Sequence, residues 1–520
     1  MRKIFASLCV MALVMNSIEA QGMWGDTPIT ISTPGVAASA QQISLDPTGN
    51  ATAVWIEDGF IVSKSLLFGG SWSASVTTLS GSGASDPQLV VDASGNATAL
   101  WNEGGVIKTS TQLFGGSWQV TPDTVSGASA SFGTLTADGS GNLVAVWLEG
   151  GVVLSSTKLF GGSWQVTPDT LSGSSATAPQ VAVNAAGDVF AVWQQTVSAV
   201  ETIYVATKTI GGSWGVPEAI STNTVDSGCP QIAVDPSGNA LAAWYRFVKT
   251  GTTYSKVYAQ ASYYSAGGIW TSPMDLSNAG LMDPVELMLQ VGFDAAGDAA
   301  VVWSNSADGS TFDMYASLLP VGGTWIQSGA FTLQDMLAYQ FDSDVLADSV
   351  GVVYMTYNPY TNQIGIFSTY RFVPSNRAVW SIPAALTAPG AIGFPKMAAV
   401  KLPPSVYGIG LWLAYDGSNN VLQANLGTVD LVQPASNLAV QGLTNNFEVL
   451  SEPYNLITWD ASPNAAGYRI YRNGLFWTEM GSTTLSTVDN NQSAPTVNTY
   501  TIYALDPNGG QSTGITVSYP

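Results

Sequence analysis

The sequence predicts an all-β protein in which a β-propeller of eight four-stranded blades, closed by an N-terminal strand, precedes a β-sandwich. Three repeated features predict the propeller: a strand that ends in Trp, an Asp-x-x-Gly-Asn turn before it and a Gly-Gly-Ser-Trp turn after it. The first three intervals between the strand tryptophans are each 46 residues. A repeat of about 40 to 50 residues is typical of propeller blades.

The strand ending in Trp is apolar on both of its faces. In the first copy, residues 51–55 (ATAVW), Ala51 and Ala53 point to the same side as Trp55. Thr52 and Val54 point to the other side, so such a strand needs a partner on each face, which neighbouring blades supply. The equivalent positions are Trp101, Trp147, Trp193, Trp244 and Trp303, with degenerate copies around Tyr354 and Trp412.

A polar turn precedes each of these strands. Its copies are residues 46–50, 92–96, 138–142, 184–188, 235–239 and 294–298. An Asp or Asn side chain caps such a turn, and the Gly adopts a positive φ. A calcium loop is the alternative, but each turn offers only one or two carboxylates. We therefore expect structural turns, with no metal and no cofactor.

The Gly-Gly-Ser-Trp turn joins the third and fourth strands of each blade. The segment LFGGSWQVTPDT occurs unchanged at residues 113–124 and 159–170. The turn resembles the Asp-box of sialidase-type propellers, although only the Gly-x-Thr-Trp half is present and Leu113 and Leu159 replace the Asp. This resemblance implies blade geometry rather than activity. In an antiparallel blade both repeated turns lie on one face of the ring, the turn face, while the second hairpin and the inter-blade links lie on the other, the hairpin face.

The two ends of the repeat region predict how the ring closes. Residues 22–34 (GMWGDTPITISTP) are similar to a fourth strand without its first three, and residues 396–426 are similar to three strands without a fourth. Joined, they make one mixed blade and remove the exposed edges. The propeller should span residues 21–430 with eight blades, or seven if the degenerate C-terminal repeat is not a blade.

A different pattern follows the repeats. The segments ITWDAS with Trp459, GYRIYRNG at residues 467–474 and NTYTIYALDPNGG with Tyr500 are similar to a fibronectin type III domain, over residues 434–520. The resemblance implies a β-sandwich with Tyr500 in a tyrosine corner. It also implies a spacer or adhesive role.

Composition excludes several classes of function. Only 10% of residues are charged, and the formal net charge is −21, so nucleic acid, anionic membranes and polyanionic substrates are disfavoured. The chain has no His, which excludes Ser-His-Asp and Cys-His catalysis and histidine metal ligands.

Residues 1–20 have the charged start, apolar run and small final residue of a secretory signal peptide. We therefore expect a monomer without a membrane span that is secreted, periplasmic or on the cell surface. Removal of Cys9 with this segment leaves Cys229 alone, and we expect that thiol to be a buried apolar residue.

Candidate binding residues lie on the hairpin face. Glu57, Glu103 and Glu149 each follow a repeat Trp by two residues, and adjacent carboxylates could form an acid/base pair or a cation site. From the fourth blade on, the loops of this face become longer and more aromatic. The predicted lining of a polar, aromatic groove is Tyr245, Arg246, Tyr254, Trp303 and Asp308.

Three functions fit these observations. The leading expectation is a non-catalytic binding or adhesion protein that recognises a glycan or a protein. Sialidase chemistry would need an arginine triad, whereas the propeller contains only Arg246, Arg371 and Arg377. The alternative is a carbohydrate-active enzyme with a carboxylate pair, tested at Asp308 and Glu103, and a structural surface repeat protein is the third hypothesis.

Overall fold

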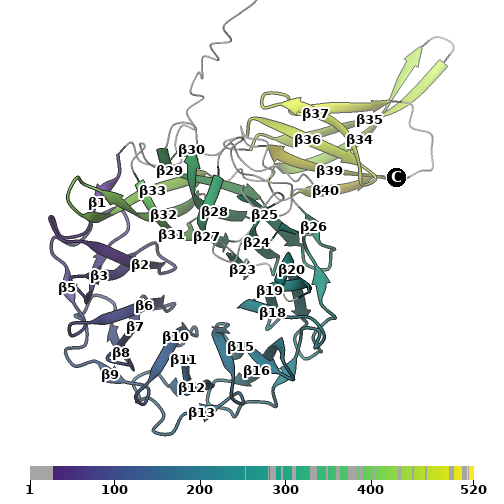
Figure 1. Ribbon diagram of the computed structural model, residues 1–520. Coiled ribbons are helices and arrows are strands. Elements are labelled where there is room, and N and C mark those ends of the chain that lie inside the picture. Colours follow the sequence, from purple (N-terminus) through teal and green to yellow (C-terminus); the bar gives the residue numbers. More distant parts are fainter. Residues whose placement is uncertain are drawn as a thin grey trace, which may run out of the picture.

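The protein is a ring of β-sheets followed by a second β-structure (Figure 1). The computed structural model describes residues 27–251, 253–278, 280–281, 288–293, 297–306, 312–327, 337–346, 349–358, 363–372, 384–385, 391–402, 405–430, 435–447, 450–462, 465–490, 497–505, 512 and 514–519. Every regular element among them is a β-strand. In these ranges no helix has the length and apolar character needed to cross a bilayer.

Eight antiparallel sheets make the ring in the described part of the chain, and in each blade the first strand lies toward the centre (Figure 1). Blades 1 to 4 contain β2 (Ala38–Leu45), β3 (Ala51–Glu57), β4 (Phe60–Leu66) and β5 (Thr77–Thr78); β6 (Ala84–Val91), β7 (Ala97–Glu103), β8 (Val106–Gln112) and β9 (Asp123–Thr124); β10 (Ala130–Ala137), β11 (Leu143–Glu149), β12 (Val152–Lys158) and β13 (Asp169–Thr170); and β14 (Ala176–Val183), β15 (Asp188–Val197), β16 (Val200–Thr209) and β17 (Glu218–Ala219).

Blades 5 to 7 contain β18 (Ser227–Val234), β19 (Ala240–Thr250), β20 (Thr253–Tyr264) and β21 (Met274–Asp275), with β22 (Gly280–Leu281) beside β20; β23 (Leu289–Phe293), β24 (Ala299–Ser306), β25 (Phe312–Leu319) and β26 (Ile326–Gln327); and β27 (Leu337–Leu346), β28 (Ser349–Asn358), β29 (Gln363–Phe372) and β30 (Ala384–Ala385). Each of these blades has the strand order of the chain.

The eighth blade joins the two ends of the propeller, as the sequence predicts. It contains β31 (Ala391–Leu402), β32 (Ser405–Tyr415), β33 (Asn420–Asp430) and, as its fourth strand, β1 (Ile29–Thr30). Ile29 pairs with Ala424 and Thr30 with Gln423. The eight-blade prediction is confirmed, and the seven-blade alternative is wrong, because the degenerate repeat around Trp412 forms a full sheet.

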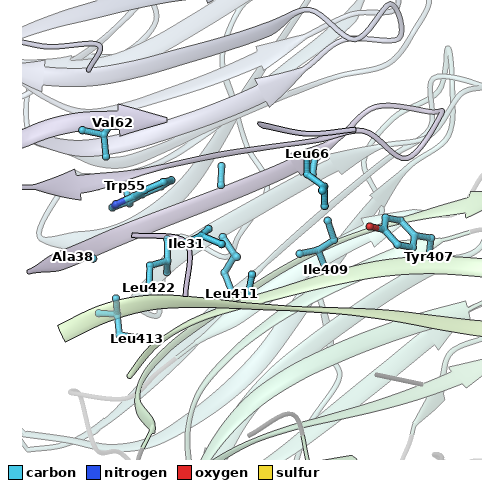
Figure 2. Packing of buried hydrophobic residues seen from close by; sticks show 13 residues of the cluster. Ile31, Ala38, Trp55, Val62, Leu66, Tyr407, Ile409, Leu411, Leu413 and Leu422 are labelled. Carbon is cyan, nitrogen blue, oxygen red and sulfur yellow. The ribbon is translucent and has the colours of Figure 1, made fainter. Parts of the chain in front are cut away.

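The core lies between the blades. Ala51, Ala53 and Trp55 pack against blade 8, whereas Val54 packs against blade 2, which is the alternation expected for a strand buried on both faces. Figure 2 shows the packing of the closing segment, where Ile31 lies among apolar side chains of blades 1 and 8. Ring closure therefore buries apolar surface as well as pairing an edge.

The two repeated turns are joined by hydrogen bonds on the turn face. Asp46 Oδ1 accepts hydrogen bonds from the backbone N–H groups of Thr48 and Asn50, at 2.8 and 2.9 Å. Burial opposes its ionisation, but the hydrogen bonds from Asn50 and Thr48 lower the pKa of Asp46. Asn50 Oδ1 in turn accepts the Phe68 N–H at 2.9 Å, and the same bond recurs between Asn96 and Phe114. The structural interpretation of both motifs is thereby supported.

The C-terminal strands form two sheets, one of three strands and one of four. Their order is β34 (Ser436–Phe447), β35 (Leu450–Asp460) and β38 (Ser486–Asn490), and β37 (Leu475–Gly481), β36 (Gly467–Arg472), β39 (Asn498–Leu505) and β40 (Ile515–Tyr519). Trp459, Tyr468 and Tyr500 are buried together. Tyr500 Oη donates to Asp489 Oδ2 at 2.7 Å and accepts from Asn455 Nδ2 at 3.0 Å, so it bonds side chains rather than the upstream backbone of a tyrosine corner.

Candidate functional site

The three glutamates that follow the repeat tryptophans stabilise the blades by accepting hydrogen bonds. Glu57 Oε1 accepts the Trp55 indole N–H at 2.8 Å and the backbone N–H of Thr33 at 2.7 Å. Glu103 and Glu149 accept the indoles of Trp101 and Trp147, each at 3.1 Å. Gln195 accepts the Trp193 indole in the fourth blade at 3.2 Å. In blades 1 to 4 the residue at this position accepts the indole N–H, and Gln195 shows that it need not be a carboxylate.

Glu149→Ala should lower the free energy of unfolding by about 1–3 kcal/mol, because it leaves the buried Trp147 N–H without its acceptor. Glu149→Gln keeps an acceptor for the indole, so the free energy of unfolding should change much less in this variant. Urea denaturation measures both, and Glu218→Ala on the exposed β17 is the matched control. Equal losses in the Ala and Gln variants would contradict the indole-acceptor role.

Two of the predicted groove residues are part of the core. Tyr245 is 1% exposed, and its hydroxyl donates to the carbonyl oxygens of Met288 and Ser304 at 2.7 and 2.9 Å. Trp303 is 2% exposed and stacks on Tyr315, with 6.1 Å between ring centroids. Neither side chain is placed to line a groove, because both are buried in one apolar cluster formed by blades 5 and 6.

Arg246 is held within blade 5. Its guanidinium makes an ion pair with Asp275, at 2.9 Å between Nη2 and Oδ2, and its Cζ lies 4.0 Å from the centroid of the Tyr258 ring. Asp308 lies outside the described residues. Within those residues, no three carboxylate or thiol side chains gather as a metal site.

Cys229 is exposed, so the expectation of a buried thiol is wrong. It lies in β18 between Gly228 and Gln231, where the register of the pairing with β19 shifts. Its φ is 56°. The bulge interrupts the alternation of the strand, so the side chain does not take the inward position that the sequence pattern predicts.

Tyr254 is the predicted residue that belongs to a group of polar side chains. Strands β19 and β20 have 11 and 12 residues, whereas β3 and β4 have 7 each, so the long loop of blade 5 is an extension of its hairpin. On this extension the Tyr254 hydroxyl donates to Asp226 Oδ2 at 2.8 Å. Lys249 Nζ lies 2.5 Å from the same oxygen and 4.6 Å from the centroid of the Tyr254 ring.

Asp226 connects this group to blade 4. It is 7% exposed in the link before β18, and its Oδ1 accepts the backbone N–H of Glu201 at 3.0 Å. Glu201 lies at the start of β16, directly after the β15–β16 hairpin. We call Glu201, Asp226, Lys249 and Tyr254 the acid–tyrosine cluster. It lies on the hairpin face between blades 4 and 5.

The environments of the two carboxylates push their pKa values in opposite directions. Burial, followed by the negative charge of Asp226, raises the pKa of Glu201, although Lys249 offsets part of this effect. Burial opposes ionisation of Asp226, but hydrogen bonds from Lys249, the Glu201 N–H and Tyr254 together lower its pKa. Glu201 therefore retains a proton to higher pH than an ordinary Glu, whereas Asp226 stays ionised.

Burial and the hydrogen bond to Asp226 raise the pKa of Tyr254, so its hydroxyl is protonated at neutral pH. The cluster thus offers a proton donor, a buried anion and a phenol hydrogen-bonded to that anion. Sequence reasoning missed Glu201, Asp226 and Lys249, although Glu201 and Lys249 lie in the two long loops that it singled out. Their partnership with Asp226 has no sequence pattern, because the link before β18 has no repeated acidic position.

Solved structures similar to this chain include a polysaccharide lyase, a sialidase and an arabinanase. A polysaccharide lyase, Uly1, is 9% identical and covers 66% of this chain and 89% of its own, with a TM-score of 0.41. The Hadza microbial sialidase Hz136 is 10% identical, with coverage of 54% and 73% and a TM-score of 0.28. An α-L-arabinanase from Penicillium chrysogenum is 11% identical, with coverage of 66% and 92% and a TM-score of 0.33.

No protein-family model matches the chain. No curated protein matches it in sequence. The expected non-catalytic binding or adhesion role is corrected: the solved structures named above are described as a polysaccharide lyase, a sialidase and an arabinanase. The carbohydrate-active alternative replaces that expectation. At these identities no site residue is transferred from the similar structures to this chain.

Proposed function

We propose that this protein is a carbohydrate-active enzyme that cleaves glycosidic bonds at the acid–tyrosine cluster. The observation that carries the proposal is the placement of Tyr254 and Glu201 against the buried Asp226, whose two carboxylate oxygens accept the Tyr254 hydroxyl and the Glu201 N–H. This environment raises the pKa of Glu201 and lowers that of Asp226. Such a pair is the usual arrangement for acid/base work, since one group must hold a proton while the other remains an anion.

In the proposed reaction Glu201 donates its proton to the oxygen of the leaving group. Tyr254 Oη attacks the anomeric carbon, and its proton becomes acidic as the C–O bond forms and passes to Asp226 Oδ2, 2.8 Å away. Water then attacks the glycosyl–tyrosine bond, with the Glu201 carboxylate as base, and the phenol regains its proton from Asp226. Tyrosine nucleophiles are a known variant of glycoside hydrolysis.

A neutral glycan fits this site better than an acidic one. The formal net charge of −21 repels anions, and Arg246 is already paired with Asp275. Lys249 is paired with Asp226 in the same way. The described part of the propeller therefore offers no uncommitted Arg beside the cluster for a uronate or sialate carboxylate.

The wild-type protein should turn over at least one member of a panel of neutral aryl glycosides and polysaccharides. Because the proton on Glu201 is needed, kcat should fall as pH rises through its raised pKa, above the ordinary 4.5. Reducing-sugar and chromogenic assays between pH 3 and 9 measure this profile. Absence of turnover across the panel, or a rate that rises with pH over this range, would overturn the proposal.

Two further assignments complete the proposed organisation. Residues 434–520 would form a fibronectin type III module that acts as a spacer, which the two sheets of three and four strands and the buried Trp459 and Tyr500 support. Residues 1–20 would be a signal peptide that exports a monomeric protein, a proposal that rests on their charge and hydropathy pattern alone.

A further inference from the structure

The first strand carries the same unusual backbone conformation in five successive blades. One non-glycine residue per strand has a left-handed φ, at the point where the pairing with the second strand shifts register. These residues, which we call the bulge ring, are Ala40 (φ 51°), Asp86 (53°), Phe132 (51°), Ala178 (48°) and Cys229 (56°).

Glycine would adopt this conformation without strain, because the left-handed region crowds any Cβ. The chain has 54 glycines and uses them for left-handed residues elsewhere, as at Gly49, Gly95 and Gly141 in the Asp-x-x-Gly-Asn turns. None of the five bulge positions is Gly. The chain thus has a side chain at five positions where glycine would relieve backbone strain. Backbone strain of this kind is typical of functional sites.

The bulge ring lies on the same face as the acid–tyrosine cluster. The bulges are at the ends of the first strands that pair with the last residues of the second strands, as Ser39 pairs with Ile56. That end adjoins the hairpins, and the first strands surround the centre of the ring (Figure 1). In blade 5 the bulge residue Cys229 is three positions after Asp226.

Packing does not explain the residue types in the ring. Blades 2 and 3 share an identical twelve-residue turn, yet they carry Asp86 and Phe132 at this position. Phe132 is 64% exposed, so its ring is not needed to fill the core, and Ala40 satisfies the same backbone position in blade 1. Asp86 is also exposed, and its Oδ2 accepts a hydrogen bond from Ser85 Oγ at 2.9 Å. The residue at this position therefore differs between otherwise similar repeats, and it is exposed in blades 2 and 3.

We propose that two exposed side chains of the bulge ring, Phe132 and Asp86, form a binding subsite for a neutral oligosaccharide, with Phe132 stacking on the apolar face of a sugar ring and Asp86 accepting its hydroxyl groups. The class of ligand rests on the proposed function, but binding at the ring does not require catalysis. The first strands of two successive blades thus present an exposed aromatic ring and an exposed hydroxyl acceptor. A sugar can use both, because it has apolar C–H faces and hydroxyl edges.

The test separates strain from recognition. Phe132→Gly and the matched control Ala40→Gly both remove a left-handed Cβ, so both should raise Tm or leave it unchanged. Isothermal titration with neutral oligosaccharides of two to eight units should show at least tenfold weaker binding for Phe132→Gly and unchanged binding for Ala40→Gly. Phe132→Asn, which tolerates a left-handed φ without an aromatic ring, should weaken binding as Phe132→Gly does, and Phe132→Tyr should retain it.

The outcomes distinguish this subsite from the proposed reaction. Binding that weakens in Phe132→Gly without any turnover supports the subsite and overturns the enzyme. Turnover with an unchanged KM in Phe132→Gly overturns the subsite and leaves the enzyme standing. A wild-type protein that binds no member of the oligosaccharide series also overturns the subsite.

Discussion

Glu201→Gln should lower kcat by about 10²- to 10⁴-fold on substrates with poor leaving groups, because the amide has no proton to donate to the glycosidic oxygen. On dinitrophenyl glycosides, whose leaving group needs no proton, the loss in the first chemical step should be much smaller. The alkaline fall of the wild-type pH profile should also disappear, since it reports the proton on Glu201. Steady-state kinetics on a matched series of leaving groups measures these differences.

Two glutamates provide controls for this experiment. Glu218→Gln changes an exposed carboxylate on the outer strand of the same blade. Glu103→Gln keeps the acceptor for the Trp101 indole but loses the ion pair with Lys108. Both variants should keep kcat within a factor of about two of wild type, since neither group belongs to the cluster. A uniform loss for good and poor leaving groups in Glu201→Gln would show that Glu201 is not the proton donor.

Ile31→Ala should lower the free energy of unfolding by about 2–5 kcal/mol, the usual cost of truncating a fully buried aliphatic side chain. Ile31 is 1% exposed and packs among the apolar residues of blades 1 and 8 (Figure 2). Its N–H also donates to the carbonyl oxygen of Leu422 at 2.8 Å, so the residue joins the N-terminal segment to the last blade. Urea denaturation followed by tryptophan fluorescence measures the change.

Ile29→Ala is the matched control for the closing strand. Ile29 lies two residues earlier, is 51% exposed, and pairs with β33 through its backbone alone. Its truncation should change the free energy of unfolding by less than about 0.5 kcal/mol. Similar losses in the two variants would mean that buried contact at the junction of blades 1 and 8 does not stabilise the ring.

The sequence predicted the propeller, its eight blades and its mixed closing blade. Those predictions succeeded because turns and alternating strands are local patterns that recur in every repeat, and the segment at residues 22–34 resembles a fourth strand closely enough to be paired with residues 396–426. The hydrogen bonds between Asn50 and Phe68 and between Asn96 and Phe114 confirm that the repeated turns share a face. The same local patterns predicted the long hairpin loop that carries Tyr254.

The sequence by itself thus determined the architecture and the face on which to look, while the tertiary structure decided which side chains work together. Glu201 and Asp226 belong to different blades, and Tyr254 is 28 residues from Asp226. Their contact depends on how one blade packs on the next, which no repeat encodes. Tyr245 and Trp303 have the same aromatic character as Tyr254, yet they are buried because inter-blade packing, rather than residue type, sets exposure. The left-handed bulges likewise arise from the pairing between strands, so the left-handed φ of Phe132 could not be predicted from the sequence.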